Sequence, residues 1–464
     1  MTEEEEERWR RPLEMQLRQR RQRRTALLNV LIRAVVYGGC LALFFLLMGV
    51  NNWPLRHLSR TSGTTLLTWC AMGAAMMAVY GKLDLGQHRR AMICAQGLGC
   101  MVTDIVTYVQ LQIMNVNPNN HDRLILFGED FLWLVLCVVL QGVVITLAVC
   151  LGNAWYHRLN PPQRALLILA DPAQEPRYRA CLHRERRRYR IDAVCLCGNP
   201  DILHRIREAE VVFLAGDIPP RERSALLQHC YENRRDVLCK AGLQEILLSS
   251  ARQVILDDAP FLAIDAVRIT PVQRVIKRGM DIVLSALLLM VLSPLLLAVG
   301  VIIRLSDGGP ALFSQERLTV DGRRFTIRKF RTMRLSGAAA TSATVGDARI
   351  TRIGRFLRRW RIDELPQLIN ILAGDMSLVG PRPEMIENIE RYKAQLPTFA
   401  YREKMKAGLT GYAQIEGRYN TTPEDKLMLD LKYIEGFSLW EDIKLLLRTL
   451  TVFFKPDSTE GFEE

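Results

Sequence analysis

The chain has 464 residues, of which 49% are hydrophobic, and a formal net charge of +13. This length and composition indicate more than one domain and exclude a disordered protein. Arginine dominates the basic residues and is spread along the chain, which favours anionic lipids and phosphate-bearing substrates over nucleic acid as partners. The sequence has no zinc-finger spacing, no RNA-binding aromatic signature and no Cys-x-x-Cys pair. We therefore predict no nucleic-acid binding, no disulfide framework and no zinc site.

Residues 1–25 are predicted to form a basic cytoplasmic N-terminus. An acidic run from Glu3 to Glu7 is followed by eight arginines between Arg8 and Arg24. A signal peptide would continue with a short apolar core and a small-residue cleavage site. Neither follows here, so this segment is not interpreted as a signal peptide.

Four apolar stretches come next, each near the length of a bilayer crossing: 26–49, 64–81, 91–114 and 130–152. We predict a four-helix transmembrane bundle over residues 26–153, embedded in the lipid bilayer and compatible with a helix–helix homodimer. Basic residues gather before the first stretch, after the second and after the fourth, so both ends of the bundle are expected in the cytoplasm. Asp104 lies in the third stretch, where ionisable residues are often functional. Because it has no evident charged partner, a structural role is favoured.

Residues 160–270 alternate short apolar runs with polar helical segments, which indicates a Rossmann-like α/β domain with a doubly wound parallel sheet. A nucleotide site would need a glycine-rich turn after the first strand. The sequence there is Leu169-Ala170-Asp171-Pro172-Ala173, without glycine and with a carboxylate that would repel phosphate. The domain is therefore predicted to have a degenerate nucleotide site and to act as a scaffold or regulator.

The stretch 278–304 is apolar and long enough to cross a bilayer. It is interrupted at Ser293-Pro294, and proline kinks a helix because it lacks an N–H donor. A fifth crossing would place the arginine-rich segment 304–334 outside the cell, against the positive-inside bias. We therefore predict a re-entrant membrane helix that enters and leaves on one face, bent at Ser293 and Pro294.

A hairpin is predicted next, with its turn at residues 320–323 between two alternating apolar runs. Lys329 and Arg331 flank Phe330, so both cations should share one face of the second strand. Residues 335–350 are small and polar, and are interpreted as a mobile loop that could close over a substrate.

The stretch 358–383 combines carboxylates with arginines. Asp363 and Glu364 are adjacent at a predicted helix start, with Pro366 in the first turn. Gly380-Pro381-Arg382-Pro383 forms a stiff turn that holds one guanidinium, because each proline restricts the backbone. Asp363 could be only a helix N-cap, but a cap requires neither the upstream arginines nor the Pro-Arg-Pro turn. The combination indicates an anionic substrate, a metal ion, or both.

Two further segments complete the chain. Residues 408–420 hold three glycines around Tyr412 and Gln414, which fits either a set of tight turns or a substrate contact. Residues 439–454 are apolar with interspersed cations, and are predicted to form an interfacial helix rather than a crossing.

The motif RIDELPQLINILAGDMSLVGPRPE, which starts at Arg361, resembles the signature of the bacterial sugar transferases, the monotopic polyprenyl-phosphate hexose-1-phosphate transferases. Three other blocks agree: KRGMDIVLSALLLMVLSPLLL from Lys277, RKFRTM from Arg328 and GLTGYAQIEGRYN from Gly408. Together they cover residues 275–464, which are expected to form a C-terminal α/β catalytic domain. The preceding residues resemble the long form of the family, which primes exopolysaccharide or capsule synthesis.

This resemblance implies the transfer of a sugar-1-phosphate from a UDP-sugar to undecaprenyl phosphate, with release of UMP. It implies a multi-pass protein of the bacterial inner membrane with its catalytic domain on the cytoplasmic face, working before downstream glycosyltransferases. UDP-glucose or UDP-galactose is the favoured donor. A UDP-N-acetylated sugar is one alternative, and a catalytically decayed membrane scaffold or regulator is another.

The resemblance also implies roles for residues. Asp363 is the expected nucleophile, kept ionised by arginines, metal and helix start, and Glu364 is expected to bind Mg²⁺ with it and to assist the second step. Arg358 and Arg382 are candidate phosphate ligands because a guanidinium can grip phosphate with two hydrogen bonds. The remaining candidates are Lys329 and Arg331 for phosphate, and Pro381, Pro383, Tyr412 and Gln414 for the sugar or nucleotide.

Overall fold

The computed structural model describes residues 3–80, 83, 85–86, 89–114, 126–264, 269–334, 349–417 and 421–452. Most of the predicted loop 335–350 therefore lies outside the described residues. The chain divides into two compact units, Met1–Lys240 and Ala241–Glu464, which are described separately.

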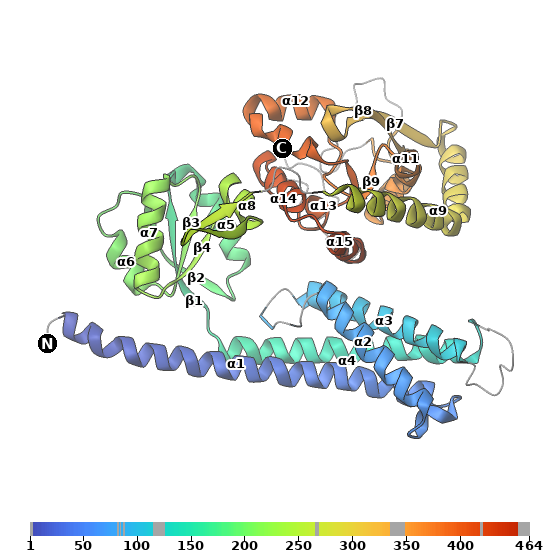
Figure 1. The fold of residues 1–464 in the computed structure, drawn as a ribbon, viewed down its shortest axis with the longest axis horizontal. Helices are drawn as coiled ribbons and strands as arrows, with labels where there is room; N and C mark the ends of the chain where they lie inside the picture. Colours follow the sequence, from blue (N-terminus) through green and yellow to red (C-terminus); the bar gives the residue numbers. More distant parts are fainter. Residues whose placement is uncertain are drawn as a thin grey trace. The chain divides into compact units, whose positions relative to one another are not determined.

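Four long helices open the first unit: α1 (Glu3–Met48), α2 (Arg60–Tyr80), α3 (Arg89–Ile113) and α4 (Glu129–Leu159) (Figure 1). A short 3-10 helix, η1 (Trp53–Arg56), follows α1. The helix α1 packs against α4, α4 against α3, and α3 against α2, and all four contribute to one apolar core. Each of the four is long and apolar enough to cross a membrane. These helices indicate a membrane protein, as predicted.

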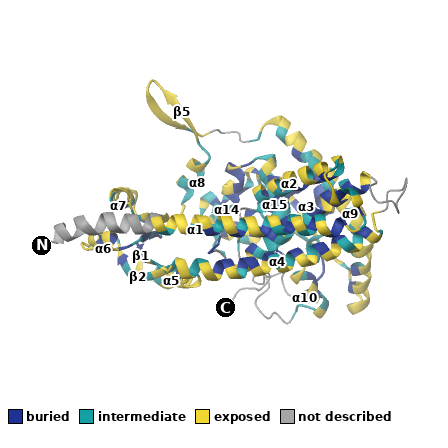
Figure 2. Ribbon diagram, turned by 90° about the horizontal axis from the view of Figure 1, so that it is seen from below, coloured by how far each residue is buried: buried dark blue, intermediate teal, exposed yellow. Residues whose placement is uncertain are grey.

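The outer surfaces of these helices remain apolar. Leu46 is 68% exposed, Leu67 72% and Leu132 71%. Figure 2 shows exposed residues recurring along α1 and α4. Apolar side chains facing outward at this density would be costly in water, and the hydrocarbon of a bilayer removes that cost.

Asp104 is fully buried on α3, and its carboxylate has a partner on another helix. The indole Nε1 of Trp69, on α2, donates a hydrogen bond of 2.9 Å to Asp104 Oδ1. A buried polar group costs free energy unless it is hydrogen-bonded, so this contact favours the structural role.

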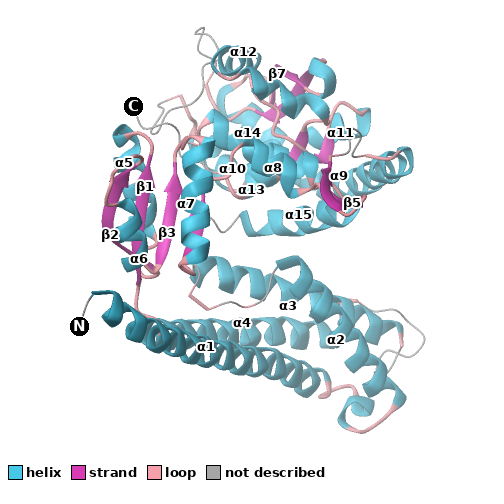
Figure 3. Cartoon of the chain, turned by 60° about the vertical axis from the view of Figure 1, so that its left-hand side comes forward, coloured by secondary structure: helices cyan, strands magenta, loops and turns pink. Residues whose placement is uncertain are grey.

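The rest of the first unit is a four-stranded parallel sheet, shown in Figure 3. Its strands are β1 (Gln163–Leu169), β2 (Tyr189–Leu196), β3 (Val211–Ala215) and β4 (Asp236–Cys239). The connections are η3 (Pro172–Gln174), α5 (Glu175–Arg184), α6 (Ile202–Glu208) and α7 (Pro220–Glu232). Leu166 and Ile168 pack with α6 and α7, whereas Leu167 and Leu169 pack with α5. Helices cover both faces, so the doubly wound prediction is confirmed.

The strand order is β2-β1-β3-β4. This is the flavodoxin-like order of doubly wound sheets rather than the 3-2-1-4 order of dinucleotide-binding folds. At the end of β1, the Asp171 carboxylate accepts a hydrogen bond of 2.9 Å from the Ala173 backbone N–H. The Asp171 side chain thus caps the turn after β1, and the degenerate nucleotide site stays a prediction.

The second unit begins earlier than expected. Its first helix, α8 (Leu243–Ser249), packs against α14 (Pro423–Glu435), and Leu243 and Ile246 join the core of this unit. Strands β5 (Arg252–Leu256) and β6 (Ala259–Ala263) form an antiparallel hairpin. Residues 241–264, which the predicted domain 160–270 includes, therefore belong to the second unit. Local sequence patterns did not show this boundary because α8 is joined to the unit only by tertiary packing.

A single long helix follows, α9 (Pro271–Asp307), 37 residues in length. It starts at the N-cap Thr270, whose hydroxyl accepts from the Gln273 N–H, and ends at Gly308, which adopts φ 71°. Pro294 lies inside this helix, and Figure 1 shows the helix bent into two arms. The first arm is the part before the bend, and the second arm is the part after it. Like α1 to α4, α9 is long and apolar enough to cross a membrane.

Two small sheets lie in the rest of this unit. The predicted hairpin is formed by β7 (Leu312–Leu318) and β8 (Arg324–Phe330), with its turn at η4 (Val320–Gly322). Strand β9 (Ser377–Val379) pairs in parallel with β10 (Gly408–Thr410). The remaining helices are α10 (Arg352–Arg359), η5 (Ile362–Glu364), α11 (Gln367–Ala373), α12 (Ile386–Gln395), η6 (Pro397–Lys404), α13 (Tyr412–Ile415) and α15 (Leu439–Val452).

Candidate functional site

Asp363 and Glu364 lie in η5, a one-turn helix between α10 and α11. Arg361 precedes it in the left-handed region, with φ 51°, which is uncommon for a non-glycine residue and occurs often at functional sites. Pro366 is the residue before α11 rather than part of its first turn. The two carboxylates therefore belong to a separate turn, and not to the start of α11 as predicted.

Three cations from different segments converge on Glu364. Its carboxylate lies 3.3 Å from Lys329 Nζ, 3.5 Å from Arg361 Nη1 and 3.8 Å from Arg382 Nη2. Lys329 belongs to β8, and Arg382 lies in the turn after β9. Burial alone would raise the pKa of Glu364, but these three cations outweigh burial and hold the pKa well below its usual range. Glu364 is therefore a permanently charged anchor that orients the surrounding cations.

Asp363 differs from its neighbour. Within the described residues its carboxylate makes no hydrogen bond and no ion pair within 4 Å. Burial and the adjacent Glu364 charge raise its pKa, although Lys329, Arg358 and Arg361 oppose the shift. The expectation that the surrounding protein groups lower the pKa of Asp363 is thus corrected, because burial and Glu364 prevail over the cations. An unpaired carboxylate of this kind is open to a ligand.

The other predicted cations, Arg358 and Arg331, contact Thr332 and Gly309 rather than Glu364. The Nε of Arg358 donates to Thr332 Oγ1 at 2.9 Å. Arg331 is buried, and its guanidinium lies against Gly309, where a Cβ atom would overlap it. The structure thus brings Lys329 and Arg382 to Glu364, and places Arg358 and Arg331 against Thr332 and Gly309.

Close backbone contact holds the Gly-Pro-Arg-Pro turn in place. Gly380 N–H donates to Thr410 O at 2.9 Å, and Gly408 N–H donates to Pro381 O at 2.8 Å. A Cβ on Gly380 would overlap the carbonyl oxygen of Lys406, so glycine is required at this approach. The parallel β9–β10 pair therefore fixes the backbone from which Arg382 projects, with Pro383 following it.

Buried charged residues contact the backbone of Arg382 and the segment that follows it. Arg402 Nη2 donates to the Arg382 carbonyl oxygen at 2.6 Å and lies 2.7 Å from Asp430 Oδ2. Lys426 Nζ lies 3.3 Å from Glu384 Oε1. Burial opposes the charge of Glu384, but Lys426, Arg402 and Arg382 prevail and set its pKa at about 2, whereas burial raises the pKa of Asp430 to about 6.

Tyr412 and Gln414 make internal contacts. The Tyr412 hydroxyl donates to Glu441 of α15 at 2.5 Å, and Lys432 Nζ lies 4.5 Å from the Tyr412 ring centroid. Gln414 Nε2 donates to Gly408 O at 3.2 Å. These contacts join α13 to α15, α14 and β10, and they support the turn set that the glycines predicted.

Sequence analysis missed Arg317 of β7. Its side chain is half-buried with the Nε atom buried, and its Nη2 donates to Gln315 Oε1 at 2.7 Å. Burial lowers its pKa to about 10, and Glu364, Arg382, Glu384 and Glu387 lie near enough to influence it. The available signal was the pair Gln315 and Arg317 on the inward face of a short strand, two polar residues where an apolar alternation is usual.

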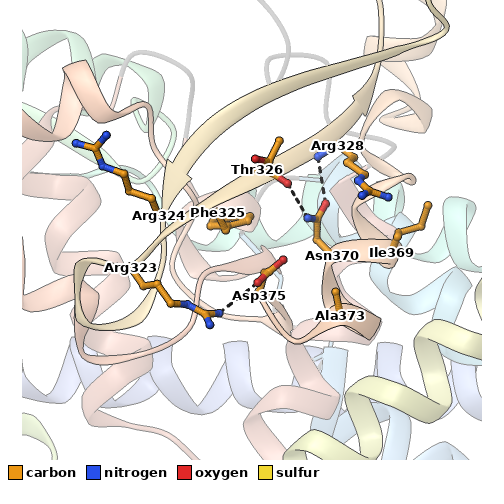
Figure 4. A pocket seen from close by; sticks show the side chains of 9 residues that line it. All are labelled: Arg323, Arg324, Phe325, Thr326, Arg328, Ile369, Asn370, Ala373 and Asp375. Carbon is orange, nitrogen blue, oxygen red and sulfur yellow. Dashed lines mark hydrogen bonds and ion pairs between the residues drawn. The ribbon is translucent and has the colours of Figure 1, made fainter.

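A cavity of about 260 Å³ lies between β8 and α11 (Figure 4). In it, Asn370 Nδ2 donates to Thr326 O at 2.7 Å, and the Arg328 N–H donates to Asn370 Oδ1 at 3.1 Å. Arg323 pairs with Asp375 at 3.3 Å. Asn370 thus links α11, the helix after Asp363, to β8, the strand that contains Lys329.

Among the described residues no group of three or more His, Cys, Asp and Glu side chains could hold a metal ion. Mg²⁺ needs only one or two protein carboxylates when substrate phosphates complete its coordination. The unpaired Asp363 carboxylate beside Glu364 meets that requirement, so these residues fit a magnesium ion that is shared with a phosphate-bearing substrate.

Residues 272–456 match the family model described as bacterial sugar transferase. The chain is 40% identical over 205 residues to the UDP-glucose:undecaprenyl-phosphate glucose-1-phosphate transferase of Escherichia coli. This match covers 43% of this chain and 44% of that protein. It is 45% identical over 189 residues to the Caulobacter vibrioides protein of the same description, covering 39% of this chain and 71% of that protein. A UDP-N-acetylgalactosamine-undecaprenyl-phosphate N-acetylgalactosaminephosphotransferase of Aeromonas hydrophila is 40% identical over 186 residues, 39% of this chain and 44% of the relative. The chain therefore spans less than half the length of two of these relatives.

Proposed function

Because the chain belongs to the bacterial sugar transferase family, we propose that it transfers a sugar-1-phosphate from a UDP-sugar to undecaprenyl phosphate and releases UMP. The observation that carries the proposal is the unpaired Asp363 carboxylate beside a Glu364 that three cations hold. Two of the similar proteins are named for UDP-glucose and one for UDP-N-acetylgalactosamine. UDP-glucose is therefore the first donor to test, with UDP-galactose and N-acetylated donors as alternatives. The product would prime exopolysaccharide or capsule synthesis.

The proposed reaction consists of two displacements at one phosphorus. A carboxylate oxygen of Asp363 attacks the β-phosphorus of the UDP-sugar, the bond from that phosphorus to the bridging oxygen breaks, and UMP leaves with the oxygen. A phosphate oxygen of undecaprenyl phosphate then attacks the same phosphorus and breaks the aspartyl–phosphate bond. The carboxylate is restored, and the lipid-linked diphosphate sugar forms. Each step exchanges one phosphate linkage for another, so positioning and charge neutralisation supply the acceleration.

The cations of the site suit that task. Lys329 on strand β8 and Arg382 on the Gly-Pro-Arg-Pro turn flank Glu364. Arg358 lies at the end of α10, just before η5. Preorganised cations stabilise charge on phosphate oxygens without having to reorganise during the reaction. Asp363 and Glu364 would hold Mg²⁺, which neutralises phosphate charge when bound. The convergence of these residues also argues against the decayed-scaffold alternative.

The experiment that tests the proposal is UMP release from a panel of UDP-sugars by membranes that contain the protein, with undecaprenyl phosphate and Mg²⁺ added. Release with one donor would support the reaction class and identify the sugar. Absence of release with every donor of the panel would reject the proposed function.

The pH profile should report the ionisation of Asp363. Its pKa is raised, so activity should fall as the pH decreases through a value above the usual aspartate range. Glu364→Gln removes the adjacent negative charge that contributes to the shift, so its residual activity should retain an acid limb at lower pH than the wild type. The comparison uses kcat/KM for the UDP-sugar against pH for both proteins, because this ratio reports ionisation in the free enzyme. An acid limb that stays in place or moves to higher pH would contradict this assignment.

We also propose that α9 is re-entrant. A straight helix of 37 residues would be about 55 Å long. Yet the first arm bonds to the unit through Arg278, whose Nη1 and Nη2 donate to Ile371 O at 2.6 Å and Leu372 O at 2.8 Å. The second arm packs Val299 and Ile303 against Phe330 and Leu357 of the same unit. Exposed apolar residues between these contacts, such as Met290 and Leu297, support insertion of the bend into the bilayer.

In this topology the catalytic unit would face the cytoplasm at the inner membrane, and α15 would lie in the interface. A cysteine at Val320→Cys, in the β7–β8 turn, should react with a membrane-impermeant maleimide only after spheroplasts are opened. Leu58→Cys, between α1 and α2, is the matched control and should react in intact spheroplasts. The parent protein is labelled alongside, because it already contains exposed cysteines. Reaction of Val320→Cys in intact spheroplasts would reject the re-entrant topology.

A further inference from the structure

Arg317 is half-buried, and no carboxylate of the described residues forms an ion pair with its guanidinium. Its only hydrogen bond among the described residues is the one from Nη2 to Gln315, a neutral side chain. The Nε atom is buried without a hydrogen-bond partner, and no carboxylate of the described chain lies within 4 Å of the guanidinium. A buried N–H donor without an acceptor is costly, so the Nε of Arg317 is open to an acceptor atom of a ligand.

The position of Arg317 indicates what would neutralise it. It lies on β7, opposite Phe325 of β8, and its backbone bridges to Met385, which follows the Gly-Pro-Arg-Pro turn. The charges that act on its guanidinium are, from the largest effect to the smallest, those of Glu384, Arg382, Glu387 and Glu364. Arg317 on β7 therefore adjoins the segment that carries Arg382, and a diphosphate bound by Arg382 would supply an acceptor for the Nε of Arg317.

The cations around Asp363 and Glu364 lie on two sides of the hairpin. Arg358 belongs to α10, where the neighbouring Leu357 packs against Val299 and Ile303 of the second arm of α9. Arg317 lies on the side of Met385 and α12. Figure 1 shows β7 and β8 between α12 and the second arm of α9. One group of cations thus adjoins the arm proposed to enter the bilayer, and the other lies away from it.

The two substrates of the proposed reaction arrive from different phases, since the UDP-sugar is soluble and the acceptor phosphate is attached to a membrane lipid. We propose that Arg317 binds the diphosphate of the UDP-sugar together with Arg382, and does not bind the phosphate of the lipid acceptor. The inference rests on the proposed function, and it adds a binding residue and divides the cations between the two substrates.

Kinetics can separate the two assignments, because in a double displacement the kcat/KM of each substrate reports its own half-reaction. Arg317→Gln should lower kcat/KM for the UDP-sugar about 10- to 100-fold, the usual effect of losing a charged hydrogen bond. Its kcat/KM for undecaprenyl phosphate should stay within about threefold of the wild type. Arg317→Lys keeps the charge without the fork and should give an intermediate loss for the donor.

Arg324→Gln is the matched control. Arg324 lies in the same hairpin, its side chain is 65% exposed, and it pairs at 3.6 Å with the exposed Glu316. Both kcat/KM values of this variant should be unchanged. Equal losses for donor and acceptor in Arg317→Gln and Arg317→Lys, or a loss confined to the acceptor, would overturn the assignment and leave a structural or acceptor role.

Direct binding keeps this test independent of turnover. The dissociation constant of UDP, measured by titration into the full-length protein in nanodiscs, should rise about 10-fold or more in Arg317→Gln and stay unchanged in Arg324→Gln. If the wild type bound UDP but released no UMP from any donor, the proposed function would fail while the role of Arg317 would still be decided by this ratio. Equal UDP affinity in wild type and Arg317→Gln would reject the inference.

Discussion

Asp363→Asn is expected to reduce UMP release by about 10⁴-fold or more, because an amide oxygen cannot form the covalent bond that the two-step transfer requires. The substitution preserves size and leaves the ion pairs of Glu364 intact, since Asp363 takes no part in them. The loss should therefore appear in kcat with an unchanged unfolding temperature. UMP release is measured with saturating donor and acceptor.

Asp375→Asn is the matched control for this substitution. Asp375 lies just after α11 in the same unit, pairs with Arg323 at 3.3 Å and lines the cavity of Figure 4. Its replacement should leave kcat within about twofold of the wild type, because a partly exposed pair of this kind contributes at most about 1 kcal/mol. An Asp363→Asn protein that keeps a tenth or more of the wild-type rate would exclude Asp363 as the nucleophile.

The second large effect is expected at Lys277, which fastens the first arm of α9 to the second unit. Its Nζ donates to Asp442 Oδ2 at 2.6 Å, to Val379 O at 3.0 Å and to the Tyr433 hydroxyl at 3.2 Å. Among the described residues, Lys277→Met would leave the buried Asp442 carboxylate with the Tyr433 hydroxyl as its remaining hydrogen-bond partner. Breaking one side of a buried pair typically costs about 3–5 kcal/mol of unfolding free energy.

The measurement is chemical or thermal unfolding of the second unit in nanodiscs, followed by pulse proteolysis. The double variant Lys277→Met/Asp442→Leu removes both charges and should recover much of the loss, because uncharged side chains leave no stranded carboxylate. Lys444→Met, which breaks the more exposed Lys444–Glu441 pair of 3.0 Å, should cost less than about 1 kcal/mol. If the single and double variants were equally unstable, the pair would have no coupling and this explanation would be wrong.

Several elements could be predicted from sequence because the physical signal is local. The four N-terminal helices follow from apolar runs of bilayer length, and the parallel sheet from strand–helix alternation. The β7–β8 turn follows from Asp321-Gly322, two residues that adopt positive φ in the structure. The Pro-Arg-Pro turn and the adjacent carboxylates are equally local, so their place in the site was foreseeable.

Other features depend on contacts between distant segments. The strand order β2-β1-β3-β4 is decided by packing and not by the strands themselves. The parallel β9–β10 pair joins Gly380 to Thr410, and neither segment carries a pattern that names the other. The sequence also treats Asp363 and Glu364 as equals. Only the structure distinguishes the carboxylate that three cations hold from the one that forms no ion pair among the described residues, and only the structure shows that Arg317 is half-buried and close enough for the Glu364 charge to act on it.

The covalent role of Asp363 is the central claim, and exchange of labelled UMP into the UDP-sugar tests it most directly. The protein is incubated with UDP-glucose, or the donor found active in the panel, together with labelled UMP and Mg²⁺ in membranes free of undecaprenyl phosphate. A two-step transfer predicts that label enters the UDP-sugar without acceptor and that Asp363→Asn abolishes this exchange. UMP release that requires the acceptor, with no exchange in its absence, would contradict the account and indicate a direct transfer between the two substrates.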